Sequence, residues 1–500
     1  VAIMTQWLHD RIRRLESGLT PIASEGHLVV LGWTSRTAPC VRELLLSEER
    51  ARRFLRRRGV RALRVVVLAG EVTADLRAEL REHVGPHWDE EKVILRSGTS
   101  LEPEDLDRVN VQAASGVVVP GSDFELGGAR ASDARVVKTL MTMGLAEPTG
   151  EARPSVVAEI LEAEKLPVAE EAYPGDLELI ASDQTMGRII AQITRHRGLS
   201  YVFDELFSHE RGSELYVRQL EAFAGWPLEA LSSSYEECVV LGVVRAGENG
   251  YVSHLLPNPG YTLRAEDRVV FLADRFEATA PRFDPDRIPN GAANGFGETE
   301  DRHPGGVSGE EESAPHAASG DRGAGGGSDS RRILLLGWNH KVPTLLEEYG
   351  AYAEERFEID LLSMVSEEEQ AARLEDVGAK RTRVGLHFGD YTREAVLGEF
   401  DLAGYDNVVL VGSERLDSEE ATDARTILGF MLLQRRLRDL ANPPNVLVEL
   451  VDPDNGGLFA RRKEEMLVTP RLLSHMLAHV TLRPELAAVF AEICGAGGAE

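Results

Sequence analysis

The sequence predicts an α/β protein with two Rossmann-like units in tandem, the first followed by a small α+β lobe. Three observations lead to this prediction. Apolar runs such as Val65-Val66-Val67-Leu68 lack polar alternation, as expected for parallel strands covered on both faces. These runs alternate with helical patterns, which indicates βαβ units with right-handed crossovers. Finally, one series of motifs occurs twice along the chain, and such a repeat defines an architecture.

The repeat is recognised by matched motifs in the same order. Gly32-Trp33 follows the first apolar run, and Gly337-Trp338 follows the corresponding run of the second half. Further along each half comes an Asp-Ala-Arg segment and then a strand that carries a glutamate. The matched acids are 290 residues apart in both cases, Asp133 with Asp423 and Glu159 with Glu449. We therefore treat the second half as a copy of the first.

The order of elements divides the chain into six segments. In copy one we expect strands near 27–32, 64–69, 92–96, 116–120 and 155–160. The segments are an amphipathic linker helix (1–26), a first Rossmann-like lobe (27–165), an α+β lobe (166–280), a linker (281–330), a second Rossmann-like lobe (331–455) and part of a second α+β lobe (456–500).

The linker is dominated by Gly, Pro, Ser, Glu and Asp, so it cannot bury enough apolar area to offset its ordering entropy and is predicted to be disordered. Copy two stops before the strands of its second lobe, which in copy one fall around 239–273. We therefore expect a truncated second α+β lobe, with truncation of the sequence favoured over natural loss of the lobe.

Composition limits the classes of partner. The 83 acidic residues outnumber the 55 basic ones and give a formal net charge of −28, which argues against DNA, RNA or an anionic membrane surface as the main partner. The three cysteines have neither disulfide nor zinc spacing, so a reducing cytoplasm is the expected compartment. No apolar window is long enough to span a bilayer in this sequence.

The first βα turn of each copy is the place to look for a cofactor, since a Rossmann lobe holds a pyrophosphate there with glycines and a helix N-terminus. Only the first glycine of the fingerprint is present, and Trp33 would crowd a dinucleotide. A structural tight turn is therefore favoured over dinucleotide binding. The candidate cofactor-binding residues are Gly32, Trp33, Glu71, Ser122 and Asp123.

Four acids that recur in both copies are candidate ligand or cation sites: Asp133, Glu159, Asp423 and Glu449. The two aspartates are placed at helix starts, where capping and a local ion pair are the simpler explanation. The two glutamates end buried strands at the carboxyl edge of the sheet, where ligands enter such folds. Calcium would need several converging oxygens, and the chain has no EF-hand loop, so the metal and its ligands stay unknown.

Two apolar helices are candidate surfaces for association. Met186 to Ile193 and Leu472 to Val480 carry several large apolar side chains each. Packing inside the chain is the alternative explanation for both.

Several of these motifs resemble the CASTOR/POLLUX ion-channel family and, more broadly, RCK (regulator of conductance of potassium) domains. The resemblance is carried by Gly32-Trp33, the strand end Arg96-Ser97-Gly98, the Ser122-Asp123 to Arg135 segment and the Asn258-Pro259 turn closed by Asp267. It covers about 15–277 and 331–497.

The resemblance implies a function and an assembly. In that family a tandem RCK unit hangs below a cation-selective pore, and four chains form a ring of eight Rossmann lobes. It implies here a homotetrameric gating ring at the cytoplasmic face of the cell membrane, with the pore preceding Val1 or in another chain. The regulatory ligand, calcium or a nucleotide among the candidates, and the permeant ion are not given by the sequence.

Two alternatives stay open. The first is a soluble nucleotide-binding regulator that docks on a separate potassium transporter. The second is an NAD-dependent enzyme, which is disfavoured because the fingerprint glycines are missing and no histidine has a Ser or Cys partner in a recognisable elbow. We therefore predict that the chain is not an enzyme.

Overall fold

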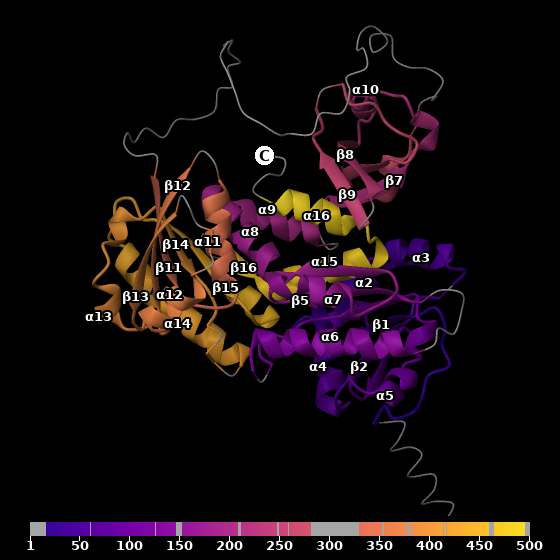
Figure 1. Cartoon of the computed structure of the whole chain (residues 1–500), viewed down its shortest axis with the longest axis horizontal. Coiled ribbons are helices and arrows are strands. Elements are labelled where there is room, and N and C mark those ends of the chain that lie inside the picture. Colours follow the sequence, from indigo (N-terminus) through magenta and orange to yellow (C-terminus); the bar gives the residue numbers. More distant parts are fainter. Residues whose placement is uncertain are drawn as a thin grey trace, which may run out of the picture.

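The computed structural model describes residues 17–495, apart from 61, 126, 147–152, 209–211, 248–249, 259, 282–329, 353–354, 376, 379–381, 414, 417 and 460–464. Most of the predicted linker helix (1–26) and nearly all of the predicted linker (281–330) lie outside the described residues. The remainder forms three sheets with helices around them (Figure 1).

The first lobe is a parallel sheet of six strands in the order β3-β2-β1-β4-β5-β6, the order of a doubly wound dinucleotide-binding fold. Its central strands are apolar and buried on both faces because helices cover both sides. The strands are β1 (Leu28–Leu31), β2 (Val65–Ala69), β3 (Val93–Ser97), β4 (Gly116–Val119), β5 (Ser155–Ile160) and β6 (Leu177–Ala181). The helices are α2 (Thr37–Leu46), α3 (Glu48–Arg57), α4 (Ala74–Val84), α5 (Pro103–Arg108), α6 (Ala129–Leu145) and α7 (Leu166–Glu170).

The sixth strand was not predicted. β6 pairs in parallel with β5, so the sheet extends into the segment that the sequence assigned to the α+β lobe. Glu178 interrupts its apolar run, and three of its five residues are only partly buried. An edge strand of this kind lacks the continuous apolar signal of a central one.

The α+β lobe begins with two helices and continues with an antiparallel sheet in the order β7-β10-β8-β9. In the predicted Asn-Pro turn, the Asp267 carboxylate accepts hydrogen bonds from the Tyr261 hydroxyl (2.6 Å) and the Arg264 amide (2.9 Å). The elements are α8 (Ser182–Arg195), α9 (Leu199–Phe207), β7 (Glu214–Gln219), α10 (Leu228–Ser232), β8 (Cys238–Gly247), β9 (Gly250–Leu255) and β10 (Arg268–Ala273).

The second copy repeats the first lobe, with the strand order β13-β12-β11-β14-β15-β16. Two helices follow its sheet, as α8 and α9 follow the sheet of copy one. The strands are β11 (Ser330–Leu336), β12 (Arg356–Ser363), β13 (Thr382–Phe388), β14 (Asn407–Leu410), β15 (Asn445–Leu450) and β16 (Glu465–Val468). The helices are α11 (Val342–Ala351), α12 (Glu367–Arg373), α13 (Glu394–Leu397), α14 (Glu419–Leu437), α15 (Thr469–Leu482) and α16 (Leu486–Cys494).

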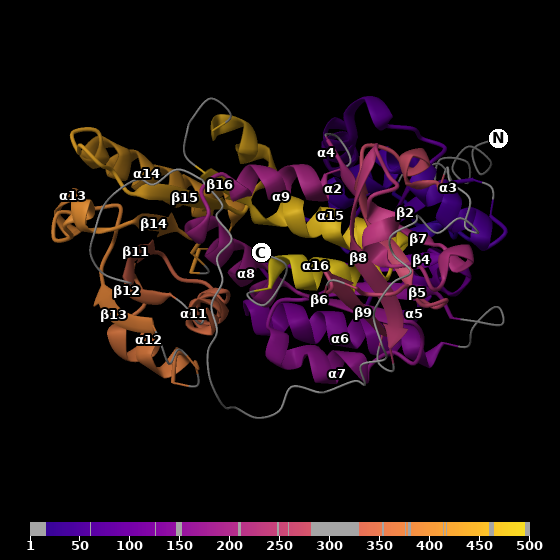
Figure 2. The ribbon, with the colours of Figure 1, turned by 90° about the horizontal axis from the view of Figure 1, so that it is seen from above.

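Each copy packs against the other through the helix that follows its six-stranded sheet, α8 in copy one and α15 in copy two. α8 of copy one packs against α11 of copy two, and α15 of copy two packs against α2 and the first sheet. Figure 2 shows α15 and α16 lying among the elements of copy one. One buried apolar cluster contains residues of both copies, among them Leu44, Ile190, Leu345 and Leu477. The two helices considered as surfaces for association thus pack inside the chain.

A glycine permits the close contact between α8 and α11. A Cβ on Gly187 would lie 3.1 Å from the Leu345 backbone nitrogen, so a larger side chain must push the two helices apart. We expect Gly187→Leu to lower the free energy of unfolding by about 1–3 kcal/mol, the usual cost of overpacking, as measured by urea denaturation. Gly187→Ala should cost less, since alanine gains about 1 kcal/mol of helix propensity over glycine.

The control for this prediction is Gln184→Leu, which places the same leucine at a partly exposed position of the same helix. It should change the free energy of unfolding by about 0.5 kcal/mol or less. Equal effects of the two leucines would contradict the role assigned to the glycine.

Candidate functional site

A buried ion network lies at the carboxyl edge of the first sheet. Arg36 follows the first βα turn, and its side chain is 0% exposed. Its Nε donates to both carboxylate oxygens of Glu159 at 3.2 Å, and its Nη1 donates to Asp123. Gly121 donates its amide to Glu159 at 2.9 Å, and the Ser182 hydroxyl donates to the same carboxylate. A cationic side chain of the protein therefore occupies the edge at which a Rossmann lobe receives phosphates.

The charges in this network stabilise one another. Burial alone would lower the pKa of Arg36, but Asp123 and Glu159 outweigh burial and raise that pKa above its usual value. Burial alone would raise the pKa of Asp123, but Arg36 and Lys341 hold that pKa below its usual range. Arg36 and Asp123 are thus both charged at neutral pH.

The second copy carries an equivalent network around Glu449. The Lys341 Nζ donates to its Oε1 at 2.6 Å, and the Thr469 hydroxyl donates to the same oxygen at 2.7 Å. The Asn339 side chain and the Gly412 amide both donate to Oε2 at 3.1 Å. Glu449 is the fifth residue of β15, as Glu159 is of β5. Burial opposes ionisation of Glu449, but the charge of Lys341 and the hydrogen bonds from Lys341, Thr469 and Gly412 together lower its pKa.

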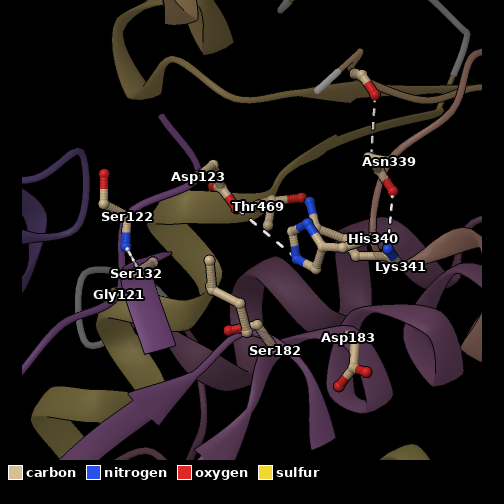
Figure 3. A network of polar contacts seen from close by, with 12 residues as sticks. Gly121, Ser122, Asp123, Ser132, Ser182, Asp183, Asn339, His340, Lys341 and Thr469 are labelled. Carbon is tan, nitrogen blue, oxygen red and sulfur yellow. Dashed lines mark hydrogen bonds and ion pairs between the residues drawn. The ribbon is translucent and has the colours of Figure 1, made fainter. Parts of the chain in front are cut away.

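The two networks meet at the contact between the lobes, as Figure 3 shows. The His340 Nε2 lies 3.9 Å from the Asp123 Oδ1. Nearby, the Thr344 hydroxyl of copy two donates to the Asp183 carboxylate of copy one at 3.2 Å. His340 of the first βα turn and Thr344 of α11, both in copy two, thus contact acids of copy one.

Asp133 and Asp423 act differently from the prediction that they cap helices. Each is the fifth residue of its helix, α6 or α14. The Asp133 carboxylate accepts the amides of Leu161 (2.7 Å) and Glu162 (3.0 Å), directly after β5. Asp423 accepts the two amides after β15 at 2.9 and 3.1 Å. The aspartates therefore tie a helix to the end of the neighbouring strand, and burial raises the pKa of Asp133 to about 6.

Three of the five candidate cofactor residues lie around a small cavity. Gly32, Trp33 and Ser122 line a pocket of about 60 Å³, far below the roughly 300–1,000 Å³ of ordinary ligand pockets. Gly32 has a φ of 120°, which suits a tight turn. Asp123 bonds to Arg36, and Glu71 is exposed at the end of β2. The cofactor role of these residues stays a prediction.

Sequence reasoning missed the two cations and the two hydroxyls of the networks. Arg36 and Lys341 each stand four residues after the glycine of a Gly-Trp motif, and Ser182 and Thr469 each open a helix. This common position in the repeat was the available signal. It was hidden because the residue types differ between the copies.

One acid at the contact between the lobes gives a testable pH dependence. Burial raises the pKa of Glu419 to about 7, although Ser35 and Arg36 of copy one oppose the rise. The pKa of an unfolded glutamate is about 4.3, so between about pH 4.3 and 7 the folded chain keeps a proton that the unfolded chain has lost. The stability that this proton contributes is fully present below about pH 4.3 and is lost as the pH rises towards 7. Relative to the unchanged chain, we expect Glu419→Gln to gain thermal stability between pH 5 and 8, with the exposed Glu420→Gln as control.

No helix among the described residues combines the length and the apolar character needed to cross a membrane. Within the same residues, no group of three or more His, Cys, Asp or Glu side chains is arranged to hold a metal ion.

Comparison with known proteins gives channels and a gating ring. The family described as "Castor and Pollux, part of voltage-gated ion channel" matches residues 183–288. The ion channel CASTOR of Lotus japonicus is 21% identical over 469 residues, which is 92% of this chain and 49% of that protein. The ion channel POLLUX of the same plant is 20% identical, over 87% of this chain and 43% of that protein. The chain thus spans about half the length of the curated relatives it matches.

A solved structure supports the fold. The human SLO3 gating ring superposes with a TM-score of 0.61 and 13% identity, over 95% of this chain and 85% of that one. The tandem Rossmann-like architecture and the resemblance predicted from the sequence are both confirmed by these findings.

Proposed function

Since the chain is a relative of the CASTOR and POLLUX channels, we propose that it is the regulatory gating-ring region of a cation channel and has no catalytic role. It would bind a small ligand or cation and couple that binding to the opening of a pore at the cytoplasmic face of the cell membrane. The observation that supports the proposal is the pair of equivalent charge networks that meet where the two lobes touch.

The networks suggest how binding would be transmitted. Asp123 is held by Arg36 of its own lobe and lies beside His340 of the other lobe. A ligand that changes the charge on one side therefore changes the preferred position of the second lobe. Such a ligand shifts a population between two arrangements, and an affinity ratio of about 100-fold, or about 2.7 kcal/mol per site, gives strong control over several sites.

Assembly into a ring needs a surface between chains. α6 exposes Met141 and Leu145, and α14 exposes Leu428 and Met431. The two methionines are equivalent positions of the repeat, 290 residues apart. We propose that these helix faces contact further copies of the chain in a homotetramer.

The test is the mass of the purified chain in solution, together with its thermal melting with and without millimolar calcium. A dimer or tetramer with a higher melting temperature in calcium would support the proposal, because a ligand that binds the native state stabilises it. The double variant Met141→Glu with Met431→Glu should lower the mass of the assembly towards that of a single chain. The change Glu170→Gln at an exposed residue should leave the mass of the assembly unchanged. A monomer indifferent to calcium and to the two glutamates would contradict the proposal.

A further inference from the structure

Helix α3 and the turn that follows it carry an excess of positive charge on an acidic chain. Residues 48–64 contain eight arginines and two glutamates, whereas the whole chain has a formal net charge of −28. The helix lies where the first Rossmann-like lobe meets the α+β lobe (Figure 1), since Arg50 donates to the Glu214 carboxylate and to the Leu215 carbonyl (3.1 Å) of β7. This stretch is therefore a local departure from the charge of the chain.

The arginines in the first half of α3 have partners within the protein. Arg50 is 3% exposed and pairs with Glu214. The Arg53 guanidinium lies over the Phe276 ring, 4.1 Å from its centroid. Arg52 pairs with a glutamate one turn away. Packing and local ion pairs thus account for these three arginines, and they need no outside partner.

Three consecutive arginines at the end of α3 are different. Arg56, Arg57 and Arg58 are exposed, and none of them forms an ion pair with a residue that the structure describes. Arg58 stacks on the Phe54 ring, which leaves the edge of its guanidinium free for hydrogen bonds. The helix dipole favours cations here, but burial and the charge of Arg57 lower the pKa of Arg58, against the opposing effect of Asp176. The neighbouring cations therefore repel one another, and a surface with several anionic groups would relieve that repulsion.

The turn after α3 touches the segment through which the chain enters its first lobe. The Arg64 Nη1 donates to the Ser24 hydroxyl oxygen at 3.2 Å, and a Cβ on Gly26 would collide with the Val60 side chain. Ser24 and Gly26 belong to the end of the predicted linker (1–26), which leads towards the pore in the proposed function. In that function, the end of α3 therefore lies on the side of the lobe that faces the pore.

The net charge of the chain does not prevent contact with an anionic bilayer at this place. Salt at physiological ionic strength screens charges over about 8 Å, so acids elsewhere on the chain act weakly on lipids beside α3. An anionic lipid surface attracts each nearby arginine strongly enough to raise the affinity roughly five-fold. A guanidinium also matches a phosphate group with two parallel hydrogen bonds.

We propose that Arg56, Arg57 and Arg58 bind the phosphate groups of anionic lipids at the cytoplasmic face of the membrane. The proposal rests on the place beneath a pore that is proposed above for the chain, and it adds a direct contact with the bilayer. A first lobe anchored in this way would let a movement of the second lobe act on the pore instead of displacing the whole unit.

The test is sedimentation of the whole chain with vesicles of phosphatidylcholine and phosphatidylserine, compared with vesicles of phosphatidylcholine alone. Binding should need phosphatidylserine and should fall as salt is raised, because salt screens exposed charges. The double variant Arg56→Glu with Arg57→Glu should weaken binding by about 25-fold or more, since two contacts each worth roughly five-fold become repulsive.

The matched control makes the same change of charge at two exposed arginines of the second sheet, Arg356→Glu with Arg383→Glu. It should change the affinity for the vesicles by less than about two-fold, because charges far from the lipid are screened. Both double variants should have the melting temperature of the unchanged chain to within a few degrees, which shows that a loss of binding is not a loss of folding.

Four results would overturn the proposal. They are equal sedimentation with both kinds of vesicle, no sedimentation with phosphatidylserine at low salt, equal losses in the two double variants, and release of the chain by inorganic phosphate at the concentration of the lipid. The mass measurement separates this proposal from the proposed function. A chain that forms the ring but ignores anionic vesicles disproves only the lipid contact, whereas a monomer indifferent to calcium counts against the proposed function.

Discussion

Replacing Arg36 with alanine should lower the free energy of unfolding by about 3–5 kcal/mol, the usual cost of removing one partner of a buried ion pair. The loss is expected to be large because Asp123 and Glu159 share this one guanidinium, whose side chain is 0% exposed. Urea denaturation measures the change, and hydrogen exchange of the β5 amides shows whether the first lobe opens.

A surface pair supplies the control for this prediction. Arg52 is 56% exposed and pairs with Glu48 one turn away, so Arg52→Ala should cost about 0.5 kcal/mol or less. Changing Arg36→Met together with Glu159→Gln and Asp123→Asn should recover much of the loss, since no buried charge is then left unpaired. Equal losses for Arg36→Ala and Arg52→Ala would contradict the role of the network.

The variant Arg36→Ala should also change how stability responds to acid. The folded pKa of Asp123 lies below its usual range, so its contribution to stability is present above about pH 4 and is lost as the pH falls further. Without Arg36 that depression shrinks. The stability of Arg36→Ala should therefore decline less steeply below pH 4 than that of the unchanged chain.

The fold was largely predictable from the sequence because its strands carry unmistakable patterns. Continuous apolar runs placed β1, β2, β4 and β5 to within a residue or two. The repeat of Gly-Trp motifs and matched acids then indicated that the second half has the same fold. By contrast, β6 escaped prediction because an edge strand with an acid in its middle has neither a continuous nor an alternating pattern.

The site was predictable only in part, for a physical reason. Glu159 and Glu449 could be placed at the carboxyl edge of a sheet because their strands are readable. Their partners come from distant segments, as Arg36 does from 123 residues away. The contact of His340 with Asp123 further depends on how the two lobes pack. Periodicity within one segment carries no information about such contacts, and a repeat search across copies finds only the positions that keep their residue type.

Lys341→Met is expected to destabilise the chain by about 3–5 kcal/mol, because it leaves Glu449 charged and buried without its cation. The two side chains are only 3% and 1% exposed. The control is Lys165→Met, since Lys165 is 37% exposed and pairs with the adjacent Glu164 at the surface. Its expected cost is about 0.5 kcal/mol or less.

The double variant Arg36→Ala with Lys341→Met tests whether the two networks act as one. Asp123 is stabilised first by Arg36 and next by Lys341, so the chain without Arg36 depends more on the lysine. The combined loss should therefore exceed the sum of the single losses by about 0.5–3 kcal/mol, the range found for residues in one network. A strictly additive result would show that each lobe is stabilised independently, and the charges at their contact could then not transmit binding from one lobe to the other.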